Sequence, residues 1–298
     1  MQPPIREPHF HFTPLGSEIA DRTFLLFGDD GATIRAMGSG VFVGRELGLT
    51  AKHVMAGIWN ELSRTPMPGG SERITASFRV FAVNFPGSQD MPAFWLVSDM
   101  WGAKYSDLAV LQLRPLTATR DKKYDAAILR LRALPPEVGD VVAAFGYPLS
   151  SVDAVSREPL ELRWSIAPYT TQGVVTQVFA ERRDRALLSF PCFEINARFE
   201  PGMSGGPIFN AQGHLCGIIS AALTEISGPT RVAYGAALWP VFGTNIDFAG
   251  PGLIVGGFYP FFELRSVGYI AESGWDEVAK RVRIAHDVDG GEYLSLEE

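Results

Sequence analysis

Short apolar runs separated by turn residues recur along the chain and predict a protein built from many short strands. From Thr23 the runs TFLLFG, SGVFVG and LGLTAKHV follow one another, and SDLAVLQL closes this first series at Leu113. A second series runs from DVVAAFGYP through QGVVTQVFA, RALLSFPCFEI, GPIFN and HLCGIISAA to RVAYGAALWP. Runs rich in β-branched and aromatic residues, bounded by Gly and Pro, are typical of strands in all-β proteins. We therefore expect an all-β chain with two consecutive groups of strands.

The two strand series divide the chain into five segments. Residues 1–16 are rich in proline and predict an extended N-terminal arm, and residues 17–115 hold the first strand group. Residues 116–135 carry charges, prolines and one short apolar run, which makes them the best candidate linker. The second strand group occupies residues 136–247, and residues 248–298 form a C-terminal extension.

The C-terminal extension departs from the strand pattern. Its first part, GLIVGGFYPFFELRSVGYI, is compatible with two further strands, and ESGWDEVAKRVRIAH predicts one short helix. Ser273 is the expected N-cap of this helix, Asp276 and Glu277 lie in its first turn, and His286 ends it. The acidic tail DVDGGEYLSLEE is expected to be frayed. In the second strand group, Gly213 predicts a tight hairpin with positive φ.

Composition is that of a globular protein and argues against several kinds of partner. Apolar residues make up 46% of the 298 residues and charged residues 20%, so a core can form without disulfides. A net charge of −7 without any basic run argues against nucleic acid. No stretch reaches the length of a membrane span, and Pro, Arg, Glu and His interrupt the N-terminus where a signal peptide would be apolar. We therefore expect a cytoplasmic bacterial protein without membrane contact.

Cysteine usage and metal-binding patterns add little chemistry. Cys192 and Cys216 lie in apolar, strand-like surroundings and are expected to be buried reduced thiols, with a disulfide as the alternative. No Cys/His spacing suits zinc, DVDGGE lacks the ligands of an EF-hand, and no Gly-rich phosphate loop opens a helix. We expect neither a metal nor a cofactor.

The segment Glu200–Asn210, EPGMSGGPIFN, is the most informative part of the chain. A catalytic serine needs a tight turn that exposes its hydroxyl and aims backbone N–H groups at a developing oxyanion. Glycine permits such a path because it has no Cβ. Gly202 lies two residues before Ser204, and Gly-Gly-Pro follows it. We expect Ser204 to be a nucleophile, with the N–H groups of Gly202 and Ser204 as its oxyanion hole. An ordinary surface loop is the alternative.

A serine nucleophile needs a neutral imidazole to accept its proton, and the imidazole needs an acceptor at its other nitrogen. His53 directly follows a strand, whereas His9 and His11 lie in the arm and His214 lies at a hairpin tip. Asp107 begins the apolar strand DLAVLQL, where a buried carboxylate is expected to be paired. We expect His53 to be the general base and Asp107 to orient it. A structural histidine and a strand-edge aspartate are the alternatives.

Six segments, in this order, resemble the chymotrypsin/trypsin superfamily of serine proteases and especially its HtrA-like bacterial branch. They are GSGVFV (38–43), LTAKHV (49–54), SDLAVLQL (106–113), VGDVVAAFGYP (138–148), QGVVTQV (172–178) and EPGMSGGPIFNAQGHLCGIIS (200–220). The resemblance implies two six-stranded antiparallel Greek-key β-barrels with the active site between them. The residue pattern adds a short C-terminal extension that contains the helix. It also implies that the Ser220 hydroxyl lies where it can contact Asp107.

Two departures from the family pattern matter. Met203 stands where digestive relatives have an Asp that pairs with a freed N-terminus, so activation by N-terminal cleavage is not expected. HtrA-like enzymes usually have Asn at this position. The residues after 245 are too few for the PDZ domain of roughly 90 residues that this branch usually carries.

The resemblance also implies a specificity pocket that includes Arg198, Ser220, Ala221 and Ala222. An inward Arg198 would favour an acidic side chain at P1, the substrate residue before the cleaved bond. An outward Arg198 paired with Glu200 or solvent is the alternative. Ala221 and Ala222 would leave the neighbouring walls open, and a small aliphatic P1 is the main alternative preference.

These observations predict a serine endopeptidase that cleaves protein or peptide substrates through an acyl-enzyme. No motif identifies a regulatory partner. The alternative is a catalytically inactive, protease-like binding module. An esterase with a similar triad is a further alternative, although the order His, Asp, Ser and the absence of a G-x-S-x-G elbow argue against an α/β-hydrolase.

Overall fold

The structure is a computed structural model of the chain. It describes residues 9–44, 46–56, 62–86, 92–116, 128–157, 160–224, 231–249, 253 and 257–297.

Six antiparallel strands close the first barrel. In order around the ring they are β2 (Thr23–Asp29), β3 (Ile34–Gly44), β4 (Leu47–Ala51), β9 (Leu108–Pro115), β8 (Ala93–Gly102) and β7 (Arg79–Asn84), which pairs back to β2. The hairpin of β5 (Leu62–Pro66) and β6 (Glu72–Ala76) extends from β8. Fully buried side chains such as Phe24, Leu49 and Trp101 fill the interior. Closure removes the free strand edges that would otherwise pair with other chains.

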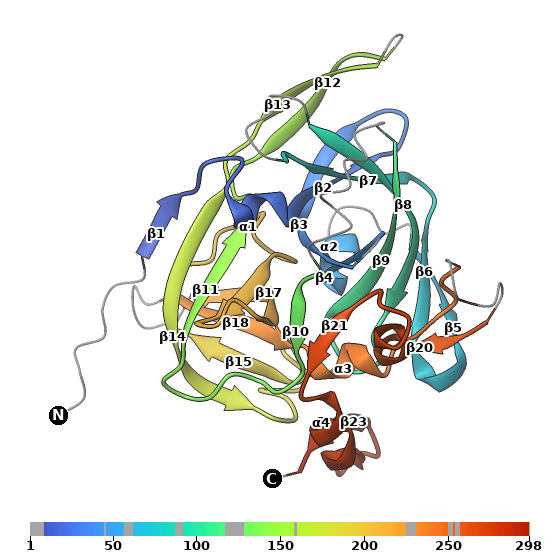
Figure 1. Ribbon diagram of the computed structural model, residues 1–298, viewed down its shortest axis with the longest axis vertical. Coiled ribbons are helices and arrows are strands. Elements are labelled where there is room, and N and C mark those ends of the chain that lie inside the picture. Colours follow the sequence, from blue (N-terminus) through green and yellow to red (C-terminus); the bar gives the residue numbers. More distant parts are fainter. Residues whose placement is uncertain are drawn as a thin grey trace.

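Six further antiparallel strands close the second barrel, which lies beside the first (Figure 1). In order they are β11 (Val141–Gly146), β14 (Tyr169–Phe179), β15 (Cys192–Ile195), β18 (Arg231–Ala237), β17 (Leu215–Thr224) and β16 (Pro207–Asn210), which pairs back to β11. Gly213, at φ 75°, turns the chain from β16 to β17 as expected. The prediction of two six-stranded antiparallel barrels is confirmed.

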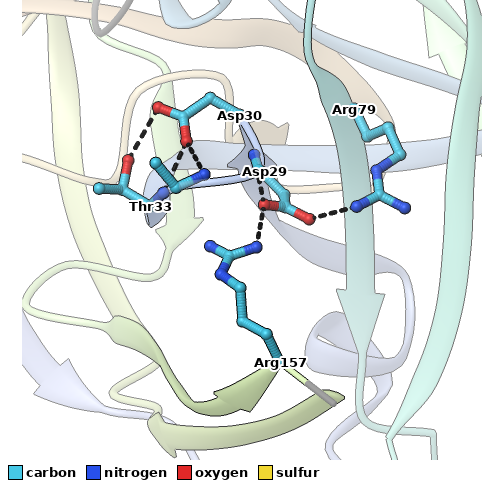
Figure 2. Close-up of polar contacts among 7 residues, drawn as sticks. Asp29, Asp30, Thr33, Arg79 and Arg157 are labelled. Atoms are coloured by element: carbon cyan, nitrogen blue, oxygen red, sulfur yellow. Dashed lines mark hydrogen bonds and ion pairs between the residues drawn. The ribbon is translucent and has the colours of Figure 1, made fainter. Parts of the chain in front are cut away.

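A long hairpin between β11 and β14 was not expected from the sequence. Its strands are β12 (Ser151–Arg157) and β13 (Leu160–Ser165), and it projects beyond the barrels (Figure 1). The buried carboxylate of Asp29, at the end of β2, accepts hydrogen bonds from Arg157 of this hairpin at 2.9 Å and from Arg79 of β7 at 2.7 Å (Figure 2). An ion cluster therefore fastens the hairpin to the first barrel.

The described part of the N-terminal arm joins the second barrel. Strand β1 (His9–Phe12) pairs antiparallel with the first residues of β14, and the ring of Phe10 stacks on Tyr169 with centroids 4.6 Å apart. The Thr13 and Thr170 hydroxyls share a 2.6 Å hydrogen bond. A one-turn helix, α1 (Glu18–Asp21), then leads into β2.

Parts of the expected linker and of the C-terminal extension form structure that joins the barrels. Residues 117–127 of the linker lie outside the described residues, and β10 (Arg130–Arg132) lies between β17 and β21 (Ala271–Ser273), parallel to both. The other elements in or next to the extension are α3 (Trp239–Phe242), β19 (Asn245–Ile246), β20 (Tyr259–Pro260) and the 3₁₀ helix η2 (Phe261–Arg265). Of the two strands expected here, β20 is only two residues long, and residues 250–252 and 254–256 lie outside the described residues.

The end of the chain corrects three expectations. The predicted helix is present as α4 (Trp275–Arg281), but Gly274, at φ 85°, is its N-cap, and Ser273 belongs to β21. The helix stops at Arg281 because Val282–His286 forms β22, which pairs with β23 (Glu292–Leu296). His286 therefore lies in a strand, and the tail that we expected to be frayed is half of a hairpin.

No helix among the described residues is long and apolar enough to cross a membrane.

Candidate active site

His53 and Asp107 are brought together by the pairing of β4 with β9. Ala51 faces Leu108 in this pair, so the residues just beyond it, His53 in α2 (Lys52–Ala56) and Asp107, leave the barrel side by side. The His53 Nδ1 lies 2.6 Å from Asp107 Oδ2, and the His53 backbone N–H donates to Oδ1 at 2.9 Å. Two contacts from one residue fix both the position and the plane of the carboxylate.

The Asp107 carboxylate is buried but faces no permanent cation among its described hydrogen-bond and ion-pair partners. Its third contact is the Ser220 hydroxyl, which donates to Oδ2 at 2.6 Å. This is the contact that the family resemblance implied. Burial by itself lowers the pKa of the half-exposed His53 imidazole, but the hydrogen bond to Asp107 and the carboxylate charge outweigh it and raise the pKa. The arrangement therefore stabilises a protonated His53.

Ser204 lies on a turn whose path depends on glycine. Gly202 and Gly205 have φ of 94° and 85°, a left-handed region that favours glycine. The Gly205 N–H donates to Ile219 O at 2.8 Å, and the Gly206 N–H donates to Met203 O at 2.9 Å. The turn is thus closed on itself and tied to β17, so the position of Ser204 is fixed by backbone contacts on both sides.

The Ser204 hydroxyl donates to Ser220 O, with the two oxygens 3.4 Å apart. The described hydrogen bonds include none between Ser204 and His53. The two residues nevertheless flank one glycine of β3: a Cβ on Gly38 would lie 2.8 Å from Ser204 O and 2.9 Å from Cγ1 of Val54, the neighbour of His53. The structure therefore joins His53 to Asp107 directly and brings Ser204 to the same place without the final hydrogen bond.

Two backbone donors beside Ser204 are left unused. Within the part of the chain that the structure describes, neither the Gly202 N–H nor the Ser204 N–H donates to a protein acceptor. Buried or turn N–H groups normally find a partner. A pair of unused donors on either side of one residue is the arrangement that can receive an oxyanion.

The residues expected to line a specificity pocket differ in exposure and in contacts. Ser220 is buried, Ala221 is partly buried and Ala222 is exposed along β17. Arg198 is largely exposed: its Nε donates to Glu200 Oε1 at 2.6 Å, and its guanidinium lies 4.5 Å from the centre of the Phe10 ring. These are the contacts of the outward alternative, and none of them supports Arg198 as a pocket residue.

Two residues that the sequence analysis did not single out organise the site. Lys52 donates from its backbone to Asp107 O at 2.7 Å and from Nζ to Ala103 O at 3.0 Å, so it holds both ends of the loop that carries Asp107. Ser39, in β3, donates through its N–H to Ser204 O at 2.8 Å. Ser39 lies in GSGVFV and Lys52 in LTAKHV, two of the segments that carry the family resemblance. Membership of these segments is the sequence feature that could have pointed to them.

Both cysteines are free and buried, as expected. Burial raises the pKa of Cys192 and of Cys216 to about 12, so neither thiol is a nucleophile at neutral pH. The described residues contain no group of three or more His, Cys, Asp or Glu side chains that could hold a metal ion.

Two closed barrels with a histidine–aspartate pair on one and a Gly-rich serine turn on the other define the trypsin-like class. The family model described as a trypsin-like peptidase domain matches residues 38–218, and the chain belongs to this family.

A curated relative is named "Probable periplasmic serine endoprotease DegP-like" and comes from Halomonas elongata. It is 26% identical over 234 residues, which are 73% of this chain and 45% of the relative. The chain therefore spans less than half of that relative's length. Because the relative is described as periplasmic, the cytoplasmic setting expected from the sequence stays a prediction.

Two solved structures are also similar. The MamO protease domain of Magnetospirillum magneticum has a TM-score of 0.49 and 17% identity, over 75% of this chain and 95% of that chain. The active form of the Rv3671c protease of M. tuberculosis has a TM-score of 0.47 and 15% identity, over 76% of this chain and 81% of that chain.

Proposed function

We propose that the protein is a serine endopeptidase that hydrolyses peptide bonds through an acyl-enzyme. Ser204 is the nucleophile and His53 is the general base. Asp107 orients the imidazole and stabilises its protonated form. The N–H groups of Gly202 and Ser204 form the oxyanion hole. The observation that carries the proposal is the pair of contacts between His53 and Asp107, at 2.6 and 2.9 Å, across from a glycine-built serine turn.

In the acylation step the Ser204 hydroxyl turns from Ser220 O toward His53. As its Oγ attacks the substrate carbonyl carbon, the proton passes to His53 Nε2, and the carbonyl oxygen becomes an oxyanion held by the two free N–H groups. The tetrahedral intermediate collapses when the C–N bond breaks. His53 gives its proton to the leaving amine, so the acyl group remains as an ester on Ser204.

Deacylation repeats these steps with water. His53 takes a proton from water, the hydroxide oxygen bonds to the ester carbon, and the oxyanion hole receives the charge again. The bond to Ser204 then breaks, the serine oxygen recovers the proton from His53, and the second product leaves as a carboxylic acid. Asp107 keeps its charge throughout and stabilises the imidazolium that forms in both steps.

The substrate is a protein or a peptide, which the family supports. An acidic P1 residue is not favoured because Arg198 already pairs with Glu200, so a small aliphatic P1 residue is the preference that we propose. Peptides with Ala, Val, Glu, Asp or Arg at P1 test this preference. Fastest cleavage after Glu or Asp would restore Arg198 to the pocket.

Covalent labelling tests the catalytic assignment. The wild-type protein should form a fluorophosphonate adduct on Ser204, and Ser204→Ala and His53→Ala should not react. His214→Ala is the matched control and should react like the wild type, because His214 lies at the turn before β17. A folded wild-type protein without an adduct would favour the inactive binding module. In that case the Ser204 hydroxyl would keep its hydrogen bond to Ser220 O and would not turn toward His53.

A further inference from the structure

We propose that Ser39 is a positioning residue for the oxyanion hole, acting from the first barrel on a turn that belongs to the second. This inference rests on the proposed function. It adds a residue outside the triad and outside the two hole donors, and it assigns that residue a task in the reaction: to hold the peptide unit that joins the two donors.

The two expected donors are separated by one peptide unit. The Gly202 N–H belongs to the peptide before Gly202 and the Ser204 N–H to the peptide after Met203, so the Gly202–Met203 peptide lies between them. If the dihedral angles on either side of this unit change, the two flanking peptides turn relative to each other, and the two donors no longer point to the same place. Rotation is easy in principle because Gly202 lacks a Cβ and lies at φ 94°, where it visits many backbone conformations.

Both ends of this peptide unit are held. Its N–H, on Met203, donates to Glu200 O at 3.0 Å within the turn. Its carbonyl oxygen, on Gly202, accepts from the Ser39 hydroxyl at 2.7 Å. The first contact is local and comes with the turn. The second comes from 163 residues away, so it is made only when the barrels are assembled.

The direction of the Ser39 hydroxyl is itself fixed. A serine hydroxyl has one proton to donate and can accept in return. The Tyr147 N–H, at the end of β11, donates to Ser39 Oγ at 3.0 Å, which leaves the serine proton for Gly202 O. Tyr147 and Ser39 are both buried, so water does not compete for these bonds.

The backbone of Ser39 adds a second hold on the same turn. Its N–H donates to Ser204 O at 2.8 Å, and its carbonyl accepts from the Thr50 hydroxyl at 2.8 Å. A Cβ on Gly205 would lie 2.1 Å from Ser39 O, so the turn packs directly on this strand. Removing the hydroxyl leaves these backbone contacts in place and releases the Gly202 carbonyl together with the Tyr147 N–H. The side chain can therefore be tested separately from barrel assembly.

The test compares Ser39→Ala with Thr50→Val, a matched control. Both variants delete one buried hydroxyl that donates to a backbone carbonyl near the turn, but only Ser39→Ala releases Gly202 O. We expect Ser39→Ala to lower kcat about 10- to 100-fold, the range for losing a hydrogen bond that orients hole donors. KM should change less than about twofold, because the hole acts mainly on the transition state. Thr50→Val should keep kcat within about threefold of the wild type.

Two further readouts separate positioning from simple destabilisation. A peptide boronate, which forms a tetrahedral adduct with Ser204, should lose affinity for Ser39→Ala by about the same factor as kcat. Ser39→Thr, which keeps the hydroxyl, should recover most of both losses. Circular dichroism and urea unfolding of every variant check that each is folded under the assay conditions.

Several outcomes would overturn the proposal. Unchanged kcat in folded Ser39→Ala would do so, and so would an equal loss in Thr50→Val or a loss in KM alone. If Ser39→Thr does not fold, the kcat and boronate comparison of the first two variants still decides. Failure of the proposed function looks different: the wild type itself would then neither hydrolyse peptides nor form the fluorophosphonate adduct, and the role assigned to Ser39 would fall with it.

Discussion

The first barrel holds two buried carboxylates that are reached from the second barrel, and their surroundings differ in one respect. Asp29 is 3% exposed and is paired with two guanidinium groups, of Arg79 and Arg157 (Figure 2). Asp107 is 8% exposed and is met by an imidazole, a backbone N–H and a hydroxyl. One carboxylate is neutralised by permanent charges, and the other is left with a partner that can gain or lose a proton.

The difference separates a structural carboxylate from one suited to chemistry. Burial by itself raises the pKa of Asp29, but the hydrogen bonds from Arg157 and Gly31 and the charges of both arginines outweigh it and lower the pKa. Its charge is thus satisfied and does nothing further than fasten the β12–β13 hairpin. The charge of Asp107 acts instead on His53, whose pKa it raises. A buried carboxylate whose described hydrogen-bond and ion-pair partners include no Arg or Lys is therefore the better candidate for a functional residue.

The largest effect expected from this comparison is that of Asp107→Asn on catalysis. The amide keeps the shape but not the charge, and it favours the wrong tautomer of His53. We expect kcat to fall by about 10⁴-fold, the loss known for this substitution in a serine protease triad. The free energy of unfolding should change little, so the variant should stay folded under the assay conditions. Steady-state hydrolysis of a fluorogenic peptide measures kcat, and urea unfolding measures the free energy of unfolding. If Asp107→Asn keeps more than about a tenth of the wild-type kcat, the Asp107 charge is not needed for catalysis.

Asp29→Asn should show the opposite pattern. Its amide cannot neutralise two guanidinium groups, so we expect the free energy of unfolding to fall by about 2 kcal/mol, as for the loss of charged hydrogen bonds at a buried acceptor. The kcat should stay within about twofold. Asp30→Asn is the control, since the described hydrogen bonds of the exposed Asp30 carboxylate are to residues of its own turn, Ala32 and Thr33, and this variant should unfold closer to the wild type. A tenfold loss of kcat in Asp29→Asn would show that the hairpin serves the site.

The sites of the two carboxylates should also differ in pH dependence, through His53 at one site and Asp29 at the other. Activity requires neutral His53, so kcat/KM should fall as pH decreases through a pKa above the ordinary histidine value of 6.5. The stability that the His53–Asp107 pair contributes is full below pH 6.5 and is lost as pH rises through the raised pKa. The Asp29 pKa is lowered from 3.8, so its contribution is present above that pH and is lost only as pH falls below it. Parallel profiles of kcat/KM and unfolding would contradict this assignment.

Ser220→Ala should give the smallest effect and sharpen the comparison. Its hydroxyl takes up part of the Asp107 charge at 2.6 Å, so without it the carboxylate should hold the His53 proton more strongly. We expect the acidic limb of the kcat/KM profile to move upward by a few tenths of a pH unit. A downward shift would mean that Ser220 acts on His53 by another route.

The sequence predicted the barrels well because their signals are local. Apolar runs bounded by turn residues mark β2, β9 and β17, and glycine at 213 marks a hairpin whose geometry only a residue with free φ adopts readily. The proposed triad residues were likewise singled out from short motifs. The closeness of Asp107 to His53 follows from strand pairing, in the register of β4 and β9.

What the sequence missed depends on contacts between distant residues. The β12–β13 hairpin has exposed apolar positions such as Val155, and its anchor is Asp29, 128 residues from Arg157. The C-terminal tail was expected to fray because its composition is acidic, yet its alternating residues pair with β22. For Arg198 the sequence left open a pocket position and an outward pairing with Glu200, and its contact with the Phe10 ring depends on where the N-terminal arm docks.

The two buried thiols can be used to measure how often the strands of the second barrel separate. Cys192 lies in β15 and Cys216 in β17, and the first barrel has no cysteine. An alkylating reagent can reach these thiols only when local unfolding separates the two strands from their neighbours. The rate of alkylation therefore measures how often the second barrel opens locally. Native protein treated with iodoacetamide should therefore modify slowly, and any ligand that holds the barrels together should slow the modification further.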